Sequence, residues 1–239
     1  MLTFNSNILQ FFVIKRQAKF FIRGSQTTKY INVIIIITIV TMIRTLIHKQ
    51  YWSILLLFYI NHNSPLHLRD ISRKINLKES ATSRHLNALE EAQILKSHNE
   101  ANLKKYSIKK QVIPKIFPLF DEERLEKLPL MRKNAIKEYL RALSNKPLLL
   151  IVFGSTAKYT FTEESDIDIL HISMKQMNIE EAKKNAEILT GIKLQIFQMT
   201  EQDFYKELKL KQDNVIQAAL TTGFPAFNNT YFYELMNYE

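Results

Sequence analysis

The sequence predicts an α/β (α+β) protein of two domains, in which a small helical domain with a hairpin precedes a domain built on buried strands. The chain has 239 residues and is 46% hydrophobic, which suffices for two compact cores. Residues 42–110 show three helical patterns followed by two strand-like runs. Residues 130–239 contain continuous apolar runs typical of buried strands, and prolines interrupt the chain between the two regions, at residues 111–129.

The net charge of +10 is distributed unevenly along the chain. Residues 1–41 carry five basic and no acidic side chains, residues 42–110 carry twelve against five, and residues 111–239 carry sixteen against eighteen. A basic excess concentrated in one domain indicates a polyanionic partner for the middle region. The absence of cysteine excludes disulfides and thiolate metal sites, and it agrees with the cytoplasmic location that we expect.

The most apolar stretch, "INVIIIITIVTMI" at residues 31–43, is thirteen residues long, whereas a membrane-spanning helix needs about twenty. Basic residues precede it as in a signal peptide, but no small-x-small cleavage site follows before Arg44. We expect a strand, or an extension over residues 1–41 that lies outside the folded protein, with translation beginning at Met42. A membrane-tethered regulator is the alternative, and it would require that protein begun at Met42 fails to stay soluble.

Residues 42–110 have the pattern of a winged helix. The segment "QYWSILLLFYINH" is apolar almost all round, as expected of a helix central to a small domain. Two further helices follow with a short connection, which predicts a helix-turn-helix. In the second of these, Thr82, Leu86 and Leu89 form the buried face and Ser80 is the expected N-cap. The run "ILKSHNEANLKKYSIKK" then supplies two short strands around a turn, which is the wing.

The segment "ATSRHLNALEEAQILK" resembles the recognition helix of ArsR- and MarR-like winged-helix regulators, which read roughly T-V-S-R-H-L-x-x-L-E-x-x-G-L-L. This resemblance implies binding to double-stranded DNA, often by a homodimer, although some winged helices bind protein instead. Gln93 stands where the family has a helix-ending glycine. A positive φ there would cost about 1 kcal/mol, so we expect a differently built turn. The candidate DNA contacts are Ser80, Ser83, Arg84 and Asn87 on the helix and Lys104 and Lys105 on the wing.

The stretch from the expected linker to residue 147 contains Pro114, Pro118, Pro129 and Pro147, so we predict that no single helix runs through residues 111–147. Asp121 and the glutamates after it suit the start of a helix. Beyond the linker, an apolar stripe at helical spacing indicates a helix that packs on the next domain, and it consists of Ile136, Leu140 and Leu143.

Two short motifs in the second domain bear chemical groups at the ends of buried strands. The strand "PLLLIVFGS" ends at Gly154 and Ser155, where a glycine lets the backbone approach a phosphate closely. "SDIDIL" reads as the next strand, in which Asp166 and Asp168 point to the same side. Two adjacent carboxylates repel each other unless a cation lies between them, and Mg²⁺ prefers such a pair together with phosphate oxygens.

"GS", then ten residues, then "DID" within apolar strands is similar to the signature of the minimal nucleotidyltransferases of the DNA polymerase beta superfamily. The resemblance covers about residues 130–239 and implies a mixed sheet with helices on one face. It also implies transfer of a nucleoside monophosphate from a Mg²⁺-NTP to a hydroxyl, for which the acceptor in related proteins is a tyrosine of a HEPN-type toxin, an antibiotic or an RNA end. Asp166 and Asp168 would then be the catalytic metal ligands, and Gly154, Ser155 and Lys158 would lie at the phosphates.

The family normally contributes a third carboxylate from a later strand, here expected in "GIKLQIFQM". Gln195 occupies about that position, and a neutral amide is a poor substitute for an anionic ligand or base. Glu181 or Asp203 could replace the missing acid, and His171 could approach the metal. Two functions therefore stay open: a DNA-binding nucleotidyltransferase, and a transcription regulator whose inactive nucleotidyltransferase-like domain senses a nucleotide.

Overall fold

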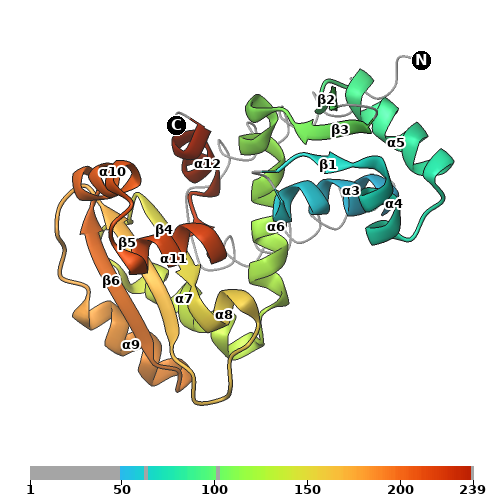
Figure 1. The fold of residues 1–239 in the computed structure, drawn as a ribbon. Helices are drawn as coiled ribbons and strands as arrows, with labels where there is room; N and C mark the ends of the chain where they lie inside the picture. Colours follow the sequence, from blue (N-terminus) through green and yellow to red (C-terminus); the bar gives the residue numbers. More distant parts are fainter. Residues whose placement is uncertain (1–48, 62–63, 101–102, 238–239) are drawn as a thin grey trace, which may run out of the picture. The chain divides into compact units, whose positions relative to one another are not determined.

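The computed structural model describes residues 49–61, 64–100 and 103–237 (Figure 1). The apolar run at residues 31–43 and the expected start at Met42 lie outside these residues. The described residues from Ser53 onward belong to one compact unit. Both predicted domains fall within this unit, except for the part of the first domain that precedes Ser53.

The first part of this unit is the predicted winged helix. Three helices are followed by a hairpin whose second strand also pairs with a short strand, giving an antiparallel sheet of order β1-β3-β2. The apolar first helix buries Ile54, Leu55 and Phe58. The elements are α3 (Lys49–Ile60), β1 (Leu66–His67), α4 (Leu68–Ile75), α5 (Glu79–Glu91), β2 (Leu95–Glu100) and β3 (Leu103–Ile108).

Helix α5 buries Thr82, Leu86 and Leu89, as its sequence pattern predicts. The expected N-cap was wrong, because the helix begins at Glu79 and its cap residue is Lys78 rather than Ser80. The expectation for Gln93 was also wrong. Its φ is +61°, its amide donates to the carbonyl of Glu90 at 3.0 Å, and the next amide donates to Leu89 at 2.9 Å. This is the turn that a helix-ending glycine normally makes, built here with a glutamine.

The stretch expected to be a linker is largely helical. A short 3₁₀ turn, Lys110–Val112, leads into α6 (Ile113–Lys127), which contains Pro118. Pro114 lies in the first turn, where the amide that proline lacks would have no helical partner, so the helix tolerates it. Asp121 does not start a helix. It lies within α6, fully buried, and its carboxylate accepts hydrogen bonds from Tyr59 at 2.6 Å and Tyr233 at 3.0 Å. Burial raises the pKa of Asp121 to about 7.

The remaining strands form a sheet that is mixed, as predicted, and that has four strands in the order β6-β5-β4-β7. β5 runs parallel to β6 and antiparallel to β4, and β4 is antiparallel to β7. The strands are β4 (Leu149–Phe153), β5 (Ile167–Ser173), β6 (Leu194–Thr200) and β7 (Phe224–Phe227). The helices are α7 (Leu130–Ala142), α8 (Gly154–Lys158), α9 (Glu180–Thr190), α10 (Glu201–Leu210), α11 (Asn214–Thr222) and α12 (Asn229–Asn237).

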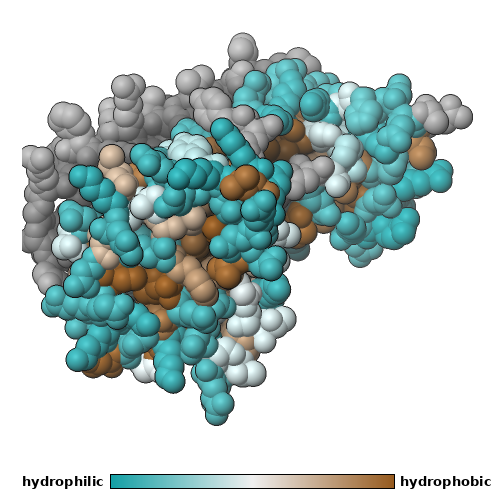
Figure 2. All heavy atoms as spheres, turned by 60° about the vertical axis from the view of Figure 1, so that its left-hand side comes forward, coloured by the Kyte–Doolittle hydropathy of each residue, from teal (hydrophilic) through white to brown (hydrophobic). Residues whose placement is uncertain are grey.

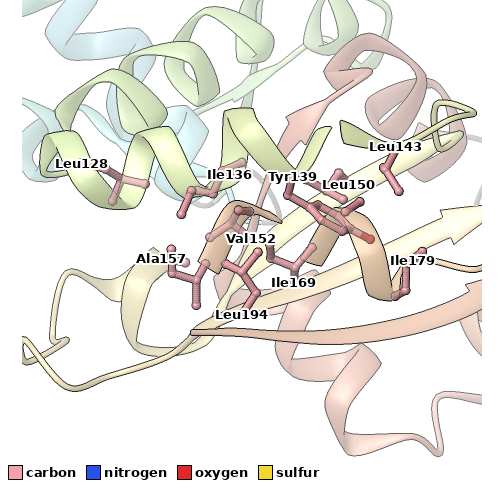
Figure 3. Close-up of a cluster of buried hydrophobic side chains, with 14 of the residues drawn as sticks. Leu128, Ile136, Tyr139, Leu143, Leu150, Val152, Ala157, Ile169, Ile179 and Leu194 are labelled. Carbon is pink, nitrogen blue, oxygen red and sulfur yellow. The ribbon is translucent and has the colours of Figure 1, made fainter. Parts of the chain in front are cut away.

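One face of this sheet is covered by α7 and α9, and the main hydrophobic cluster lies between them and the strands (Figure 3). Ile136 and Leu143 of the predicted stripe are buried in this cluster, and Leu140 packs against it. The opposite face is not bare, because α11 contacts β4 and the backbone of Gly223, at its end, lies close to Ile151. The expectation of helices on one face only was therefore wrong.

The surface seen in Figure 2 is mostly hydrophilic, with apolar side chains between polar ones. Helix α9 contributes two of the exposed apolar side chains, Ile188 and Leu189, whereas its Ala182 and Ala186 lie in the core. Within the described parts of the chain, no helix combines the length and the apolar character that crossing a membrane requires.

Candidate functional site

The bend after β4 touches a carboxylate of the neighbouring strand. Gly154 has a φ of +65°, and a Cβ added to it would overlap Oδ2 of Asp168 and lie 3.0 Å from the Cγ of the same side chain. The ladder between β4 and β5 places Phe153 opposite Asp168. Glycine is therefore required at residue 154 for two reasons, the left-handed backbone and the close approach of Asp168.

Asp166 lies immediately before β5, so the strand begins one residue later than the predicted first aspartate. Both carboxylate side chains belong to half-buried residues. Burial raises the pKa of Asp168, and the negative charge of Asp166 raises it further. The two aspartates are two residues apart at the start of β5, and a pair of neighbouring carboxylates is stabilised by a cation.

Gln195 lies beside this pair. In the parallel ladder of β5 and β6, Asp168 is the partner of Gln195, and residues paired in register project from the same face of a sheet. The strand alternation that predicted this position was therefore correct. Gln195 is exposed.

The acids proposed as replacements for a third carboxylate lie elsewhere. Asp203 is in the first turn of α10, where its carboxylate accepts hydrogen bonds from Thr200 at 2.7 Å and Lys206 at 3.3 Å. Glu181 belongs to α9, which packs on the face opposite Asp168. Among the residues that the structure describes, no group of three or more His, Cys, Asp and Glu side chains is arranged to hold a metal.

His171 also lies on the opposite face, so the idea that it approaches the metal was wrong. Its Nδ1 shares a hydrogen bond of 2.7 Å with the hydroxyl of Tyr139 from α7, and the imidazole is fully buried. Burial lowers the pKa of His171 to about 4, so the ring is neutral at physiological pH. His171 is the third residue after Asp168, and in an alternating strand this odd offset already places the two on different faces.

Two arginines near the site were not predicted. Arg132 of α7 is 3% exposed and donates to groups in α8 and in the segment before β5. Arg124 of α6 donates to Tyr59 at 3.0 Å and to carbonyls that end two helices, namely those of Ala157 at 2.9 Å and Thr222 at 3.3 Å. Arg132 lies four residues before Ile136, in line with the apolar stripe of α7. Its place on the apolar face of the helix, four residues before Ile136, was the sequence signal that this arginine is buried.

The candidate DNA-contacting residues lie mainly on one exposed side of α5. Ser80, Arg84 and Asn87 are exposed and Ser83 is half-buried. The wing lysines have partners within the protein, which the sequence did not indicate. Lys104 pairs with Glu90 at 3.0 Å, and Lys105 pairs with Glu100. Lys158, the last residue of α8, is exposed, and its role at a phosphate remains a prediction.

Comparison with known proteins agrees with both halves of this description. Residues 134–223 match the family model described as polymerase beta, nucleotidyltransferase, and residues 53–96 match the model described as winged helix-turn-helix DNA-binding. A solved structure of a Lactococcus lactis ZitR mutant in apo form is similar over 51% of this chain and 97% of that chain, with 20% identity and a TM-score of 0.28. No curated protein matches the chain.

Proposed function

Because the chain joins a winged helix-turn-helix domain to a polymerase-beta-type nucleotidyltransferase domain, we propose that it binds double-stranded DNA and transfers a nucleoside monophosphate from Mg²⁺-NTP to a hydroxyl acceptor. The acceptors that this proposal includes are the hydroxyl of a partner protein, such as a HEPN-type toxin, an antibiotic and an RNA end. The contact between Asp168 and the backbone of Gly154 is the observation on which the proposal rests, because it brings the two motifs of the second domain together.

The residues of this site fit Mg²⁺. The ion commonly binds one or two carboxylates and completes its octahedral shell with phosphate oxygens and water. Asp166 and Asp168 supply the carboxylates, and their mutual repulsion would be relieved by the cation. When bound, Mg²⁺ would neutralise phosphate charge and polarise the reacting phosphorus.

The other residues of the site have positioning roles in this proposal. Gly154, which lacks a side chain, leaves room for the Asp168 carboxylate beside the bend. Ser155 is half-buried directly after it and can donate its hydroxyl to a phosphate oxygen, and the exposed Lys158 can approach from solvent. The proposed phosphate-binding groups thus come from α8, which directly follows β4, and the proposed metal-binding acids come from the start of the adjacent strand β5 and the residue before it.

A second function, nucleotide sensing without transfer, is favoured by Gln195. The amide lies in register with Asp168 where the family provides an acid, and it can neither neutralise a cation nor accept a proton from the attacking hydroxyl. In this alternative the winged helix would act as a transcription regulator, and the second domain would report whether nucleotide is bound.

The two functions are separated by incubating the purified chain with Mg²⁺ and α-labelled NTPs, with the chain itself, cell extract and RNA as acceptors. We expect label transfer to fall at least about a hundredfold in Asp168→Asn, which removes a metal-binding charge with little change of shape. Glu164→Gln removes an exposed acid from the same connection and serves as the matched control. Retained nucleotide binding without transfer to any acceptor would instead establish the sensor.

DNA binding is tested separately by measuring duplex affinity at several salt concentrations. We expect the affinity to decrease steeply with salt, because basic side chains displace counterions from phosphates. Arg84→Ala should weaken binding by about 1–3 kcal/mol if the guanidinium contacts a base edge. Lys184→Ala removes one exposed positive charge from α9 and should leave the affinity nearly unchanged. Binding that is absent or insensitive to salt would indicate a protein partner for the winged helix.

A further inference from the structure

Arg132 of α7 donates hydrogen bonds both to α8 and to the connection between α8 and β5, the two segments that carry the motifs of the candidate site. We propose that it is a positioning residue, which fixes the distance between Asp166 and the bend at Gly154 and Ser155 and thereby sets the affinity for a divalent cation with nucleotide. This inference rests on the proposed function, because it assigns a role to Arg132 only if that site binds a metal and a nucleotide.

The hydrogen bonds of Arg132 divide between the two segments that carry the motifs. One nitrogen, Nη1, donates to Oγ1 of Thr156 at 2.9 Å and reaches the carbonyl of Asp166 at 3.5 Å. The other, Nη2, donates to the carbonyls of Thr162 at 2.8 Å and Ser165 at 2.6 Å. Thr156 directly follows Ser155 in α8, whereas the three carbonyls belong to the connection that ends at β5.

The connection is itself folded so that it presents these carbonyls inward. The amide of Thr162 donates to the hydroxyl of Ser165 at 2.9 Å, which closes a tight turn just before Asp166. The centre of the Phe161 ring lies 4.2 Å from the Arg132 guanidinium carbon. Arg132 therefore contacts the backbone carbonyls of this turn and the neighbouring Phe161 ring. Because Asp166 directly follows the turn, these contacts also fix the position of Asp166.

The charge of Arg132 is costly at this depth. Its side chain donates to backbone carbonyls and a hydroxyl, groups that satisfy hydrogen bonds without neutralising the cation. Desolvation lowers the pKa of Arg132, and the nearby charge of Asp166 raises it. The charge of this buried cation favours the ionised form of Asp166 before any metal binds.

Lysine cannot reproduce this arrangement. A guanidinium is planar and its donors diverge at fixed angles, so it reaches α8 and the connection at the same time. A single ammonium group at the end of a flexible chain can satisfy one side but does not fix the distance between them. Arg132→Lys therefore keeps the positive charge and removes the geometric constraint.

The test uses the full chain, with Mn²⁺ as a paramagnetic probe and ATP as the nucleotide. Free Mn²⁺ is measured by electron paramagnetic resonance, and the free energy of unfolding is measured for each variant in urea. We expect Arg132→Lys to weaken Mn²⁺-ATP binding by about tenfold or more in protein that remains folded. Arg141→Lys, on the same helix, alters an exposed arginine paired with Glu138 and should leave binding unchanged.

A second variant keeps the inference testable if Arg132→Lys fails to fold. Thr156→Val removes the hydroxyl that Arg132 contacts and retains nearly the same shape, so it should also weaken Mn²⁺-ATP binding. If both single variants fold, the effect of Thr156→Val should largely disappear in the Arg132→Lys background, because the two residues act through one contact.

Either of two results would overturn the inference. Unchanged Mn²⁺-ATP affinity in the folded variants would show that Arg132 stabilises the domain without positioning the site. No binding by the unmodified chain would remove the proposed function itself, and the role assigned to Arg132 with it. The two failures are distinguished by the unmodified chain, which binds Mn²⁺-ATP in the first case and does not in the second.

Discussion

Gly154→Ala is expected to reduce nucleotide binding and transfer at least about a hundredfold and to destabilise the protein by about 2–4 kcal/mol. The backbone at residue 154 has a φ of +65°, a conformation that costs a residue with a side chain about 1 kcal/mol or more. The added methyl group would also overlap Oδ2 of Asp168, so that carboxylate must rotate away from the bend. Mn²⁺-ATP titration and urea unfolding measure the two effects.

Gly191→Ala is the matched control for this substitution. Gly191 ends α9 with a φ of +70°, but a Cβ added there meets no atom within 4 Å. Gly191→Ala should therefore lower the free energy of unfolding by about 1 kcal/mol, because alanine disfavours the positive φ, and should leave the nucleotide affinity unchanged. If Gly154→Ala and Gly191→Ala behaved alike in both measurements, the close approach of Asp168 to the bend would have no functional role.

Gln195→Asp is expected to strengthen divalent cation binding by about tenfold to a hundredfold and to increase nucleotidyl transfer. Residue 195 is in register with Asp168, so the new carboxylate would project beside the two existing ones. Without metal, a third negative charge adds repulsion and should lower the free energy of unfolding. With Mg²⁺ the Gln195→Asp variant should become more stable than the unmodified chain, because a ligand that binds only the folded state stabilises that state. Thermal unfolding with and without Mg²⁺ reveals the reversal.

Gln195→Asn separates charge from shape in this experiment. Asparagine has nearly the form of aspartate but remains neutral, so it should bind Mn²⁺ no better than the natural glutamine. Equal affinities for the aspartate and asparagine variants would mean that residue 195 does not face the metal. Increased Mn²⁺ affinity without increased transfer would favour the sensor over the enzyme.

The parts of the site that could be predicted are those fixed by local periodicity. Strand alternation predicted the faces from which Asp168 and Gln195 project, whereas their placement near the bend and near each other was implied by the resemblance to the nucleotidyltransferases, and the strand ladders agree with it. The same alternation would have excluded His171, which is an odd number of residues from Asp168. His171 is close to Asp168 along the sequence, but it projects from the other face of the strand.

The remaining features depend on contacts between distant segments. Asp121 resembles a helix-starting acid until it is seen between Tyr59 and Tyr233, which are 62 and 112 residues away in sequence. α6 formed despite two prolines because one lies in its first turn and the buried aromatic residues Phe117 and Phe120 stabilise the rest by packing. Gln93 adopts a glycine-like backbone because the hairpin that follows α5 requires that turn, whatever residue occupies it.

Arg124 also affects how parts of the second domain unfold locally. One guanidinium closes the last turns of two helices, α8 through Ala157 and α11 through Thr222. If either helix end unravels, its hydrogen bond to Arg124 breaks, and the guanidinium is then less constrained to keep its bond to the other helix end. Amide hydrogens in the two last turns should therefore exchange with solvent through a shared local opening, which makes these separate stretches one cooperative unit.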